Sequence, residues 1–352
     1  MRLTYPLLGW ALTQGCTPTE ASLPGDTDTT TSTTPTTSSS TSSSTSTSTT
    51  PTGDTGIEGP VYDCDTLPLT ALAFRELPGA VGYHDVAFTE DGRILGTTTG
   101  FNMNLMSTDY DGNTQVLTTQ LGTVHQLAWL PSGDLAVGSE TDGILVVAPS
   151  GGTVTLNSNI RPYGLILGPD EMLYAADYDA IWRVDPYTGV AEEWMPGETL
   201  ASGSPRVFNF NVDNTRMFIG TLSGNGNIYA VDVDANLDRS GPIEILATNV
   251  GSGSYHDTMG IDICGYAYVA DYATQAMYRI HPTTGVVQTY LEAGGGWFSG
   301  STYGHGMEWG TGADGWLEDS VYITQPYNDN HVAEVQIGVP SKFWDGTALN
   351  RP

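Results

Sequence analysis

The sequence contains a repeated unit of roughly 40 to 50 residues, and an internal repeat of this length restricts the fold to a few architectures. Each unit begins with a short apolar strand, turns through Pro, Asp or Gly, and returns in a second apolar strand, as at 86–95, 127–135 and 259–271. A third and a fourth strand follow, as at 181–184 and 285–291. Four antiparallel strands in one unit are typical of a β-propeller blade.

The chain carries six such units, so the sequence predicts an all-β fold, a six-bladed β-propeller of four-stranded antiparallel blades. The last unit supplies strands near 305–310, 319–324 and 331–337 and lacks a fourth. Segment 69–77 has the pattern of an outer strand without a blade of its own. Because pairing it with the last unit leaves no open sheet edge, we expect this N-terminal outer strand to close the last blade.

The first 61 residues have a different composition from the rest. Residues 1–16 combine one positive charge, a short apolar run and small residues before Cys16, the pattern of a signal peptide. Residues 17–61 are rich in Ser, Thr and Pro and too poor in apolar residues to bury a core. The sequence therefore predicts a signal peptide, a disordered linker, a propeller at 62–340 and a C-terminal tail at 341–352.

Gly15-Cys16 followed by a disordered tether resembles a bacterial lipoprotein. The resemblance implies lipidation of Cys16 and an extracytoplasmic location, in the cell envelope, at the surface or secreted. Export also permits disulfides. A bridge from Cys64, before the first strand, to Cys264, in a hairpin turn, would tie down the entering chain, and two unpaired thiols are the alternative.

The charge balance limits the partners of the protein. It has 11 basic and 40 acidic residues, a net charge of −29, and its only lysine is Lys342. Nucleic-acid binding needs a basic surface, so we expect no nucleic-acid partner. Membrane contact is expected only through the lipid anchor. The negative electrostatic field of the protein favours a neutral or cationic small molecule or a divalent metal ion as the ligand. The alternative interpretation is that the acidic residues simply keep an exported protein soluble. We expect a monomer.

One polar column stands out when the six units are aligned on their turns. Its members each precede the innermost strand of a unit: His84, His125, Tyr163, Arg206, Asp257 and His305. Equivalent positions in a closed ring of blades face one another across the central axis. These side chains should therefore line one mouth of the channel.

The column has the chemistry of a metal-dependent site. Three neutral imidazoles and a carboxylate can bind zinc or another transition metal, so His84, His125, Asp257 and His305 are the predicted metal ligands. We expect Arg206 to hold a carboxylate or a developing oxyanion and Tyr163 to take part in proton transfer. A ligand site without a metal and a water-bonded channel lining are the two other interpretations.

Segments 162–177 and 257–271 resemble gluconolactonase/regucalcin-type propellers and their NHL-repeat relatives, and the resemblance extends over about 67–338. It implies the propeller fold and a lactonase-like, metal-dependent hydrolase. In such lactonases a Glu, an Asn and an Asp of this column hold a divalent ion, often calcium. Here only Asp257 matches, and His84 stands at the Glu position. Calcium prefers oxygen ligands, so the three His side chains argue against a simple transfer of that site.

A second family fits the residue types of the column better. The peptidyl-amidoglycolate lyases are NHL-type propellers with a zinc held by three His and assisted by a Tyr and an Arg, and His305 lies where such an enzyme has a zinc ligand. Three hypotheses follow. They are a metal-dependent hydrolase, a non-enzymatic binding propeller that uses aromatic loops such as 294–303, and a zinc-dependent lyase.

Other polar residues are interpreted as structural. Residues 232–238 have calcium-loop spacing but fall on a turn between strands. Asp177 and Asp271 follow second strands and are expected to cap turns. His256 neighbours Asp257 and is expected to be a satisfied loop histidine. The sequence has no Gly-x-Ser-x-Gly elbow and no phosphate-binding Gly loop.

Overall fold

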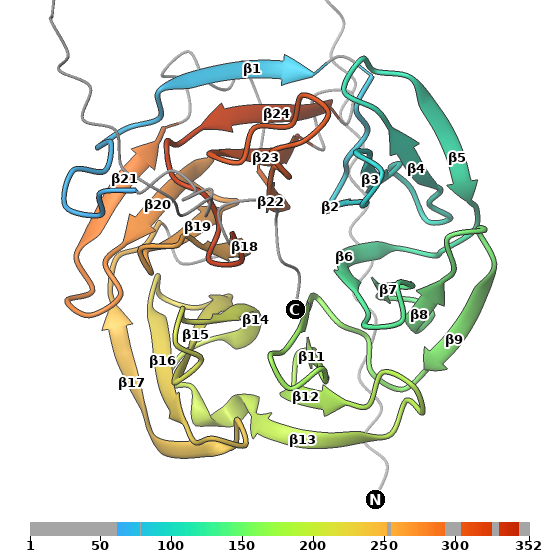
Figure 1. Cartoon of the computed structure of the whole chain (residues 1–352). Helices are drawn as coiled ribbons and strands as arrows, with labels where there is room; N and C mark the ends of the chain where they lie inside the picture. The colour runs from blue at the N-terminus through green and yellow to red at the C-terminus, as the bar shows by residue number, and fades with distance from the viewer. Residues whose placement is uncertain (1–61, 78, 252–254, 293–303, 326–330, 345–352) are drawn as a thin grey trace, which may run out of the picture. The chain divides into compact units, whose positions relative to one another are not determined.

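The computed structural model describes residues 62–77, 79–251, 255–292, 304–325 and 331–344. Their strands form six four-stranded antiparallel sheets, arranged as blades around a central axis (Figure 1). The six-bladed β-propeller that the repeat predicts is confirmed. Within the described ranges, no helix has the length and apolarity that a membrane span needs.

In five blades the strand that comes first in sequence lies innermost, and in the sixth blade β22 (Met307–Trp309) does. From the inside outward, the first blade consists of β2 (Val86–Phe88), β3 (Ile94–Thr97), β4 (Leu105–Thr108) and β5 (Thr114–Thr118). The second consists of β6 (Val124–Trp129), β7 (Leu135–Ser139), β8 (Gly143–Val147) and β9 (Thr153–Asn157). The third consists of β10 (Gly164–Leu167), β11 (Leu173–Ala176), β12 (Ala180–Val184) and β13 (Ala191–Pro196). The 3-10 helix η1 (Gly197–Thr199) follows β13.

The last three blades follow the same order. The fourth consists of β14 (Ser204–Phe210), β15 (Arg216–Leu222), β16 (Ile228–Val233) and β17 (Arg239–Ala247). The fifth consists of β18 (His256–Ile261), β19 (Ala267–Asp271), β20 (Ala276–Ile280) and β21 (Val287–Leu291). The sixth consists of β22 (Met307–Trp309), β23 (Ser320–Gln325), β24 (His331–Gln336) and β1 (Ala73–Leu77).

The turn between the first and second strands of a blade explains the Gly-rich repeat. Gly92, Gly133 and Gly265 occupy this turn with φ values of 72°, 83° and 87°. This left-handed backbone is open to Gly without a steric cost. Glu171 and Asn214 adopt the same conformation in the third and fourth blades, with φ values of 61° and 53°. The left-handed turn is therefore kept in the third and fourth blades, although its residue there is not a glycine.

The ring is closed where the two ends of the described chain meet. Strand β1 pairs antiparallel with β24, from Ala73 opposite Gln336 to Leu77 opposite Val332, and Figure 1 shows β1 on the outside of the sixth blade. The predicted closure by an N-terminal strand is confirmed, with a shorter strand than 69–77. A disulfide joins Cys64 to Cys264 across a sequence separation of 200 residues. It fastens the segment before β1 to the turn between β18 and β19.

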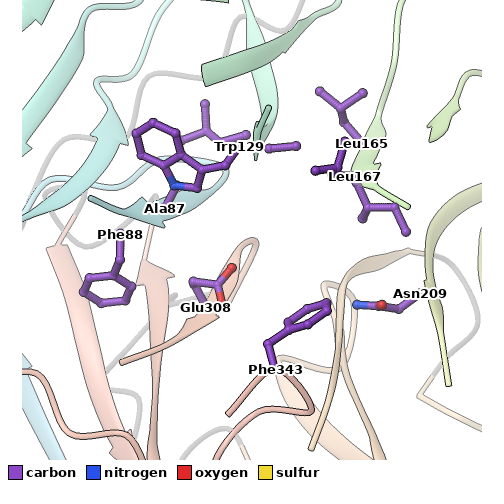
Figure 2. Close-up of a pocket in the computed structure, with 11 residues that line it drawn as sticks. Ala87, Phe88, Trp129, Leu165, Leu167, Asn209, Glu308 and Phe343 are labelled. Carbon is purple, nitrogen blue, oxygen red and sulfur yellow. The ribbon is translucent and has the colours of Figure 1, made fainter. Parts of the chain in front are cut away.

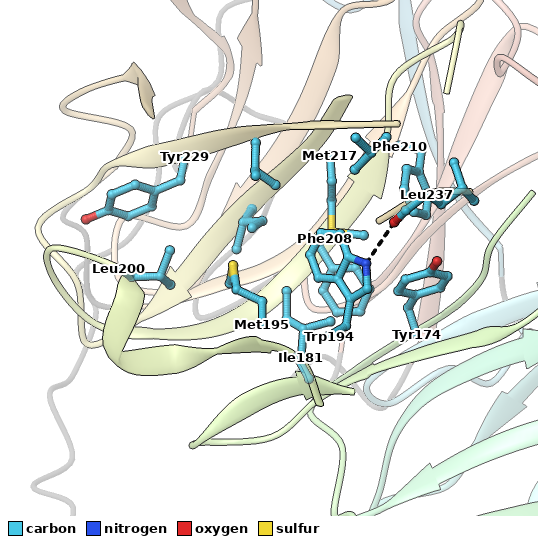
Figure 3. Packing of buried hydrophobic residues seen from close by; sticks show 14 residues of the cluster. Tyr174, Ile181, Trp194, Met195, Leu200, Phe208, Phe210, Met217, Tyr229 and Leu237 are labelled. Carbon is cyan, nitrogen blue, oxygen red and sulfur yellow. Dashed lines mark hydrogen bonds between the residues drawn. The ribbon is translucent and has the colours of Figure 1, made fainter. Parts of the chain in front are cut away.

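The hydrophobic cores lie between neighbouring blades. Figure 3 shows the core between blades three and four, where Trp194 of β13 packs among residues of β14 and β15. The indole Nε1–H of Trp194 donates a 2.8 Å hydrogen bond to the carbonyl oxygen of Leu237, so the ring is both buried and satisfied. Each such core joins two blades, because a single twisted sheet cannot bury both of its faces alone.

The C-terminal segment packs against the far ends of two innermost strands. Ser341 forms a β-bridge with Asp262, and the backbone N–H of Lys342 donates to the carbonyl of Ile261. The Lys342 ammonium donates to Asn209 Oδ1 at 2.7 Å and to the carbonyl of Phe210 at 2.5 Å. The start of the predicted tail is thus part of the folded domain.

Lys342 is expected to make stability depend on pH. Burial lowers the pKa of its amine from 10.5 to about 7. Between these pH values the unfolded chain binds one proton more than the folded chain, so the free energy of unfolding rises as the pH increases from 7 toward 10. The slope of this single group is at most about 1.4 kcal/mol per pH unit.

Urea denaturation of the wild type and of Lys342→Met at pH 7, 8, 9 and 10 measures this contribution. The other titrating groups are common to both proteins, so the difference in slope isolates Lys342. We expect a flatter pH dependence in the variant. Equal slopes in the two proteins would show that the amine keeps its ordinary pKa.

Candidate functional site

The six side chains of the predicted column meet at one mouth of the propeller channel. Together with Gln126 they line a single pocket, whose space is too small for a water molecule. We call this group the hexad: His84, His125, Tyr163, Arg206, Asp257 and His305. The side chains of the hexad therefore fill this pocket themselves.

Backbone irregularities direct three hexad side chains into the channel. The pairing register shifts across His125, between Val124 and Gln126. Corresponding shifts occur across Arg206 in β14 and Asp257 in β18. Such β-bulges bend a strand and redirect a side chain, and they are common beside active sites. The other three hexad residues lie just before β2, β10 and β22 and need no bulge.

The three imidazoles pack against one another. Nδ1 of His84 and Nδ1 of His305 are 2.8 Å apart, which is hydrogen-bond distance. The ring centroids of His84 and His125 are 4.5 Å apart, and those of His84 and His305 are 4.9 Å apart. His84 therefore stands between the two other rings.

A carboxylate stands behind each of the two flanking imidazoles. Nε2 of His125 lies 3.4 Å from Glu140 Oε2, and Nε2 of His305 lies 3.6 Å from Asp257 Oδ2. The other nitrogen of His125, Nδ1, is buried and has no hydrogen-bond partner among the described residues. Carboxylates placed behind metal-binding imidazoles fix the tautomer and raise the basicity of the ligand.

The electrostatics of the hexad favour neutral imidazoles. Burial lowers the pKa of His84, of His125 and of His305, and for His305 the value falls to about 3. The Arg206 guanidinium lowers all three pKa values further. At neutral pH the imidazoles are therefore uncharged and able to donate a lone pair.

Arg206 and Asp257 form a buried ion pair. Nη2 of Arg206 lies 2.5 Å from Asp257 Oδ1, and the two side chains are only 11% and 2% exposed. Burial raises the pKa of the Asp257 carboxyl, against the opposing effect of the guanidinium. The guanidinium also lies over the ring of Tyr163, with Cζ 5.4 Å from the ring centroid. Asp257 thus faces the guanidinium of Arg206 and Nε2 of His305.

Glu140 is a residue of this site that the sequence did not reveal. It directly follows β7, and its Oε1 accepts a 3.0 Å hydrogen bond from the hydroxyl of Tyr163. Burial raises the pKa of Tyr163, and the hydrogen bond from His125 lowers the pKa of Glu140. One carboxylate therefore connects His125 with Tyr163. The sequence did hold one indication of its role. Glu140 directly follows the second strand of its blade, and the loops at that position lie at the same channel mouth as the hexad.

Three tyrosine rings pack against the hexad. The ring of Tyr83 lies 4.3 Å from that of His84, and the ring of Tyr272 lies 5.2 Å from that of His305, measured between centroids. Tyr178 lies 4.6 Å from Tyr163 in the same measure. These rings form an aromatic rim, which the alignment of the repeats did not predict.

Several residues considered in the sequence lie outside the hexad. His256 is buried, accepts from the N–H of Thr221 at Nδ1 and bonds to the carbonyl of Val250 through Nε2, so it is a satisfied core histidine. Asp177 and Asp271 accept backbone N–H bonds in their turns, as expected. Residues 294–303, proposed as a binding loop, lie outside the described residues.

The segment with calcium-loop spacing also proves to be a turn. The carboxylate of Asp234 accepts from the backbone N–H groups of Asn236 and Asp238. Arg216 pairs with Asp232, and Arg183 pairs with Asp238. These carboxylates are therefore used for the turn between β16 and β17 and for ion pairs on its surface.

Imidazole nitrogens are the main candidate metal donors of the hexad. In the part of the chain that the structure describes, no group of three or more His, Cys, Asp or Glu side chains is arranged to hold a metal ion. The Nδ1 atoms of His84 and His305 are hydrogen-bonded to each other at 2.8 Å. To bind one tetrahedral zinc they would have to lose the shared proton and separate to roughly 3.3 Å. His125 adds a buried Nδ1 without a partner. These nitrogen donors fit zinc better than calcium.

No protein-family model matches the chain, and no curated protein matches it. Solved structures do match. A gluconolactonase of Xanthomonas campestris is 12% identical, covers 76% of this chain and 89% of its own, and has a TM-score of 0.59. A calcium-binding protein of Agrobacterium tumefaciens, regucalcin, is 15% identical over 76% and 95%, with a TM-score of 0.57. A streptogramin B lyase is 15% identical over 75% and 97%, with a TM-score of 0.51.

The chain thus has the fold of gluconolactonase- and regucalcin-like propellers. At these identities the similarity extends to the fold alone, and the chemistry must be argued from the hexad itself.

Proposed function

We propose that the protein is a metal-dependent enzyme that hydrolyses a small ester or lactone on the solvent side of the hexad. The observation that supports this proposal is the cluster of three packed imidazoles, two of which lie within 3.4 Å and 3.6 Å of a carboxylate. His84, His125 and His305 would hold the ion, and Asp257 and Glu140 would orient His305 and His125. A divalent ion bound there supplies Lewis-acid polarisation of a carbonyl oxygen.

The remaining residues have roles that follow from their contacts. Arg206 is fixed by Asp257 and places a positive charge beside the imidazoles, where it stabilises a developing oxyanion. Tyr163 keeps its proton at neutral pH, because burial and Glu140 raise the pKa of its hydroxyl. The phenol, held in place by Glu140, would therefore bind an oxygen of the substrate as a hydrogen-bonding group and not as a strong acid. The tyrosine rim keeps the substrate against these groups.

Hydrolysis of a panel of lactones and aryl esters tests this function. The full-length protein is treated with a chelator and then supplied with zinc, manganese or calcium, and proton release is recorded. We expect activity to return with zinc or manganese and less with calcium. Loss of an imidazole ligand in His84→Ala, His125→Ala or His305→Ala should lower kcat/KM by at least about 100-fold.

His281→Asn is the matched control, because His281 accepts backbone N–H bonds in an outer turn and lies away from the hexad. Its activity should equal that of the wild type. Activity that survives chelation, or that survives in the three His→Ala variants, would rule out a metal-dependent hydrolase at the hexad.

A zinc-dependent lyase is the second candidate. It is favoured by the combination of three His with a Tyr and an Arg in one ring, where Tyr163 lies beside His125 at a ring-centroid distance of 4.6 Å. Product analysis separates the two reactions. A hydrolase incorporates one oxygen atom from labelled water into the acid product, and a lyase releases its product by elimination without this incorporation.

We further propose that the protein is exported and anchored by a lipid on Cys16. The apolar run, the Gly15-Cys16 pair and the Ser/Thr-rich tether support this proposal. Expression in a bacterium, followed by fractionation, tests it. The wild type should be found with the membranes, and Cys16→Ser should be found in the soluble fraction. Equal distributions of the two proteins would contradict lipidation.

A further inference from the structure

A second cavity lies at the other end of the innermost strands from the hexad (Figure 2). Phe88, Trp129 and Leu167, which are the last residues of β2, β6 and β10, line it. Its volume is about 120 Å³, and most of its other lining residues are aliphatic. A mostly apolar cavity with a few placed polar groups is typical of a small-molecule site.

The amine of Lys342 lies beside the wall of this cavity. Its Nζ lies 4.8 Å from the centroid of the Phe343 ring and donates to Asn209 Oδ1 at 2.7 Å. Phe343 and Asn209 both line the cavity, and Figure 2 shows the Phe343 ring and the Asn209 amide turned toward each other. The amine therefore contacts the two side chains that form one side of the cavity.

The surroundings of this amine favour its uncharged form. Both of its acceptors are neutral, since the second is the carbonyl oxygen of Phe210 at 2.5 Å. Burial lowers the pKa of the amine to about 7, and no acidic side chain among the described residues counteracts this effect. About half of the Lys342 side chains are therefore neutral at pH 7.

A neutral lysine amine is a nucleophile. Desolvated lysines attack carbonyl carbons and form Schiff bases. The two hydrogen bonds of Lys342 use N–H groups of the amine, so they do not occupy its lone pair. The side chain is half-buried, and it is the only lysine of the chain. The roles derived for the hexad make no use of it.

We propose that Lys342 binds a small neutral aldehyde or ketone covalently, as a Schiff base whose carbon chain lies in the second cavity. The amine nitrogen attacks the carbonyl carbon. The carbonyl oxygen then leaves as water with the two hydrogens of the amine, so that a C=N bond replaces the C=O bond. A proton from solvent gives the imine nitrogen one N–H, which would donate to Asn209 Oδ1.

The size and charge of the cavity define the class of ligand. An apolar cavity of about 150 Å³ accommodates benzene, so a volume of about 120 Å³ suits a ligand with about five non-hydrogen atoms. Glu308 is the only charged residue of the lining, and its carboxylate accepts from the N–H of Trp309 at 2.9 Å. This negative charge would repel an anionic carbonyl compound. A neutral aliphatic aldehyde or ketone therefore fits best.

Reductive trapping at pH 7 tests this proposal. Butanal and glyoxylate are the probes, because both are aldehydes with five non-hydrogen atoms and only butanal is neutral. The full-length protein is incubated with each probe and cyanoborohydride, which reduces the C=N bond to a stable secondary amine. Mass spectrometry of the digested protein then follows the modified fraction of Lys342. The matched control is Lys342→Met/Arg239→Lys, which moves the only lysine to an exposed position on β17.

We expect butanal to modify Lys342 at least about 10-fold faster than the exposed lysine of the control, because an ordinary lysine is neutral in fewer than about one molecule in a thousand at pH 7. The same ratio should be smaller for glyoxylate, and dividing by the control removes the difference in intrinsic reactivity between the two aldehydes. If Lys342 reacts no faster than the control lysine, the amine is not activated. If the two aldehydes give equal ratios, the cavity does not select the ligand. Either result would overturn the proposal.

Asn209→Asp is the second test, and it nearly conserves the size of the side chain. It places a carboxylate beside the amine, and an opposite charge at this distance favours the charged form of lysine. Trapping of Lys342 by butanal at pH 7 should therefore slow at least about 10-fold. An unchanged rate would show that the reacting amine is not the one bonded to residue 209, and would refute the site.

Discussion

Replacing both cysteines of the Cys64–Cys264 disulfide with serine is expected to lower the free energy of unfolding by about 5 kcal/mol at 25 °C. The two cysteines are 200 residues apart in sequence. A cross-link over so long a loop removes much of the conformational freedom of the unfolded chain. The bridge also holds the segment that leads into β1, and this strand completes the sixth blade. Loss of the bridge therefore weakens the closure of the ring.

Guanidinium denaturation of the wild type, of the wild type with a reducing agent and of Cys64→Ser/Cys264→Ser measures this effect. The reduced wild type and the double variant should be equally destabilised, and the reducing agent should not change the double variant further. A loss below about 1 kcal/mol would mean that β1 and β24 hold the ring closed without the disulfide.

Breaking the ion pair in the hexad is expected to cause the second large loss of unfolding free energy. Arg206→Met should cost about 3–5 kcal/mol of unfolding free energy, because it leaves the Asp257 carboxylate buried without its partner. Both side chains are almost fully buried, at 11% and 2% exposure, and their atoms are 2.5 Å apart. The double variant Arg206→Met/Asp257→Leu removes both charges and should recover most of this loss.

Arg216 offers the matched control. It pairs with Glu244 at 2.6 Å, a similar distance, but the Glu244 side chain is 59% exposed. Arg216→Met should cost about 1 kcal/mol or less, since solvent screens exposed pairs. If Arg206→Met and Arg216→Met cost the same, or if the double variant is less stable than the single one, the hexad ion pair is not a buried, coupled unit.

The blades could be predicted because each repeats the same local chemistry. A turn residue with positive φ, such as Gly92 or Gly133, between two short apolar strands specifies a hairpin. Six repeats then leave little freedom in topology. The closing strand was also predictable, since 69–77 had no other partner. Its length was not, because only Ala73–Leu77 lies opposite β24.

The members of the hexad were predictable from their equivalent positions, and their contacts were not. Sequence spacing places His125, Arg206 and Asp257 near the axis, but β-bulges determine where their side chains point. Asp257 was expected to bind a metal, and in the structure it faces Arg206 and His305. Glu140 comes from a loop outside the aligned column, so only the assembled ring brings it to His125 and Tyr163.

The second cavity was beyond sequence reasoning for a related reason. Phe343 belongs to a segment interpreted as a tail, and only its return to the ends of β14 and β18 makes it part of the wall. Contacts between residues so far apart in sequence have no local signature. The same holds for Glu308, which is an ordinary strand residue in the sequence.

Metal analysis of the purified protein tests the central proposal, that the three imidazoles of the hexad bind a metal ion. The wild type should contain about one equivalent of zinc or another transition metal per chain, and His281→Asn should retain it. His84→Ala, His125→Ala and His305→Ala should each lose the metal. A wild-type protein that carries no stoichiometric metal, and whose Tm does not rise with added zinc, manganese or calcium, would contradict the account.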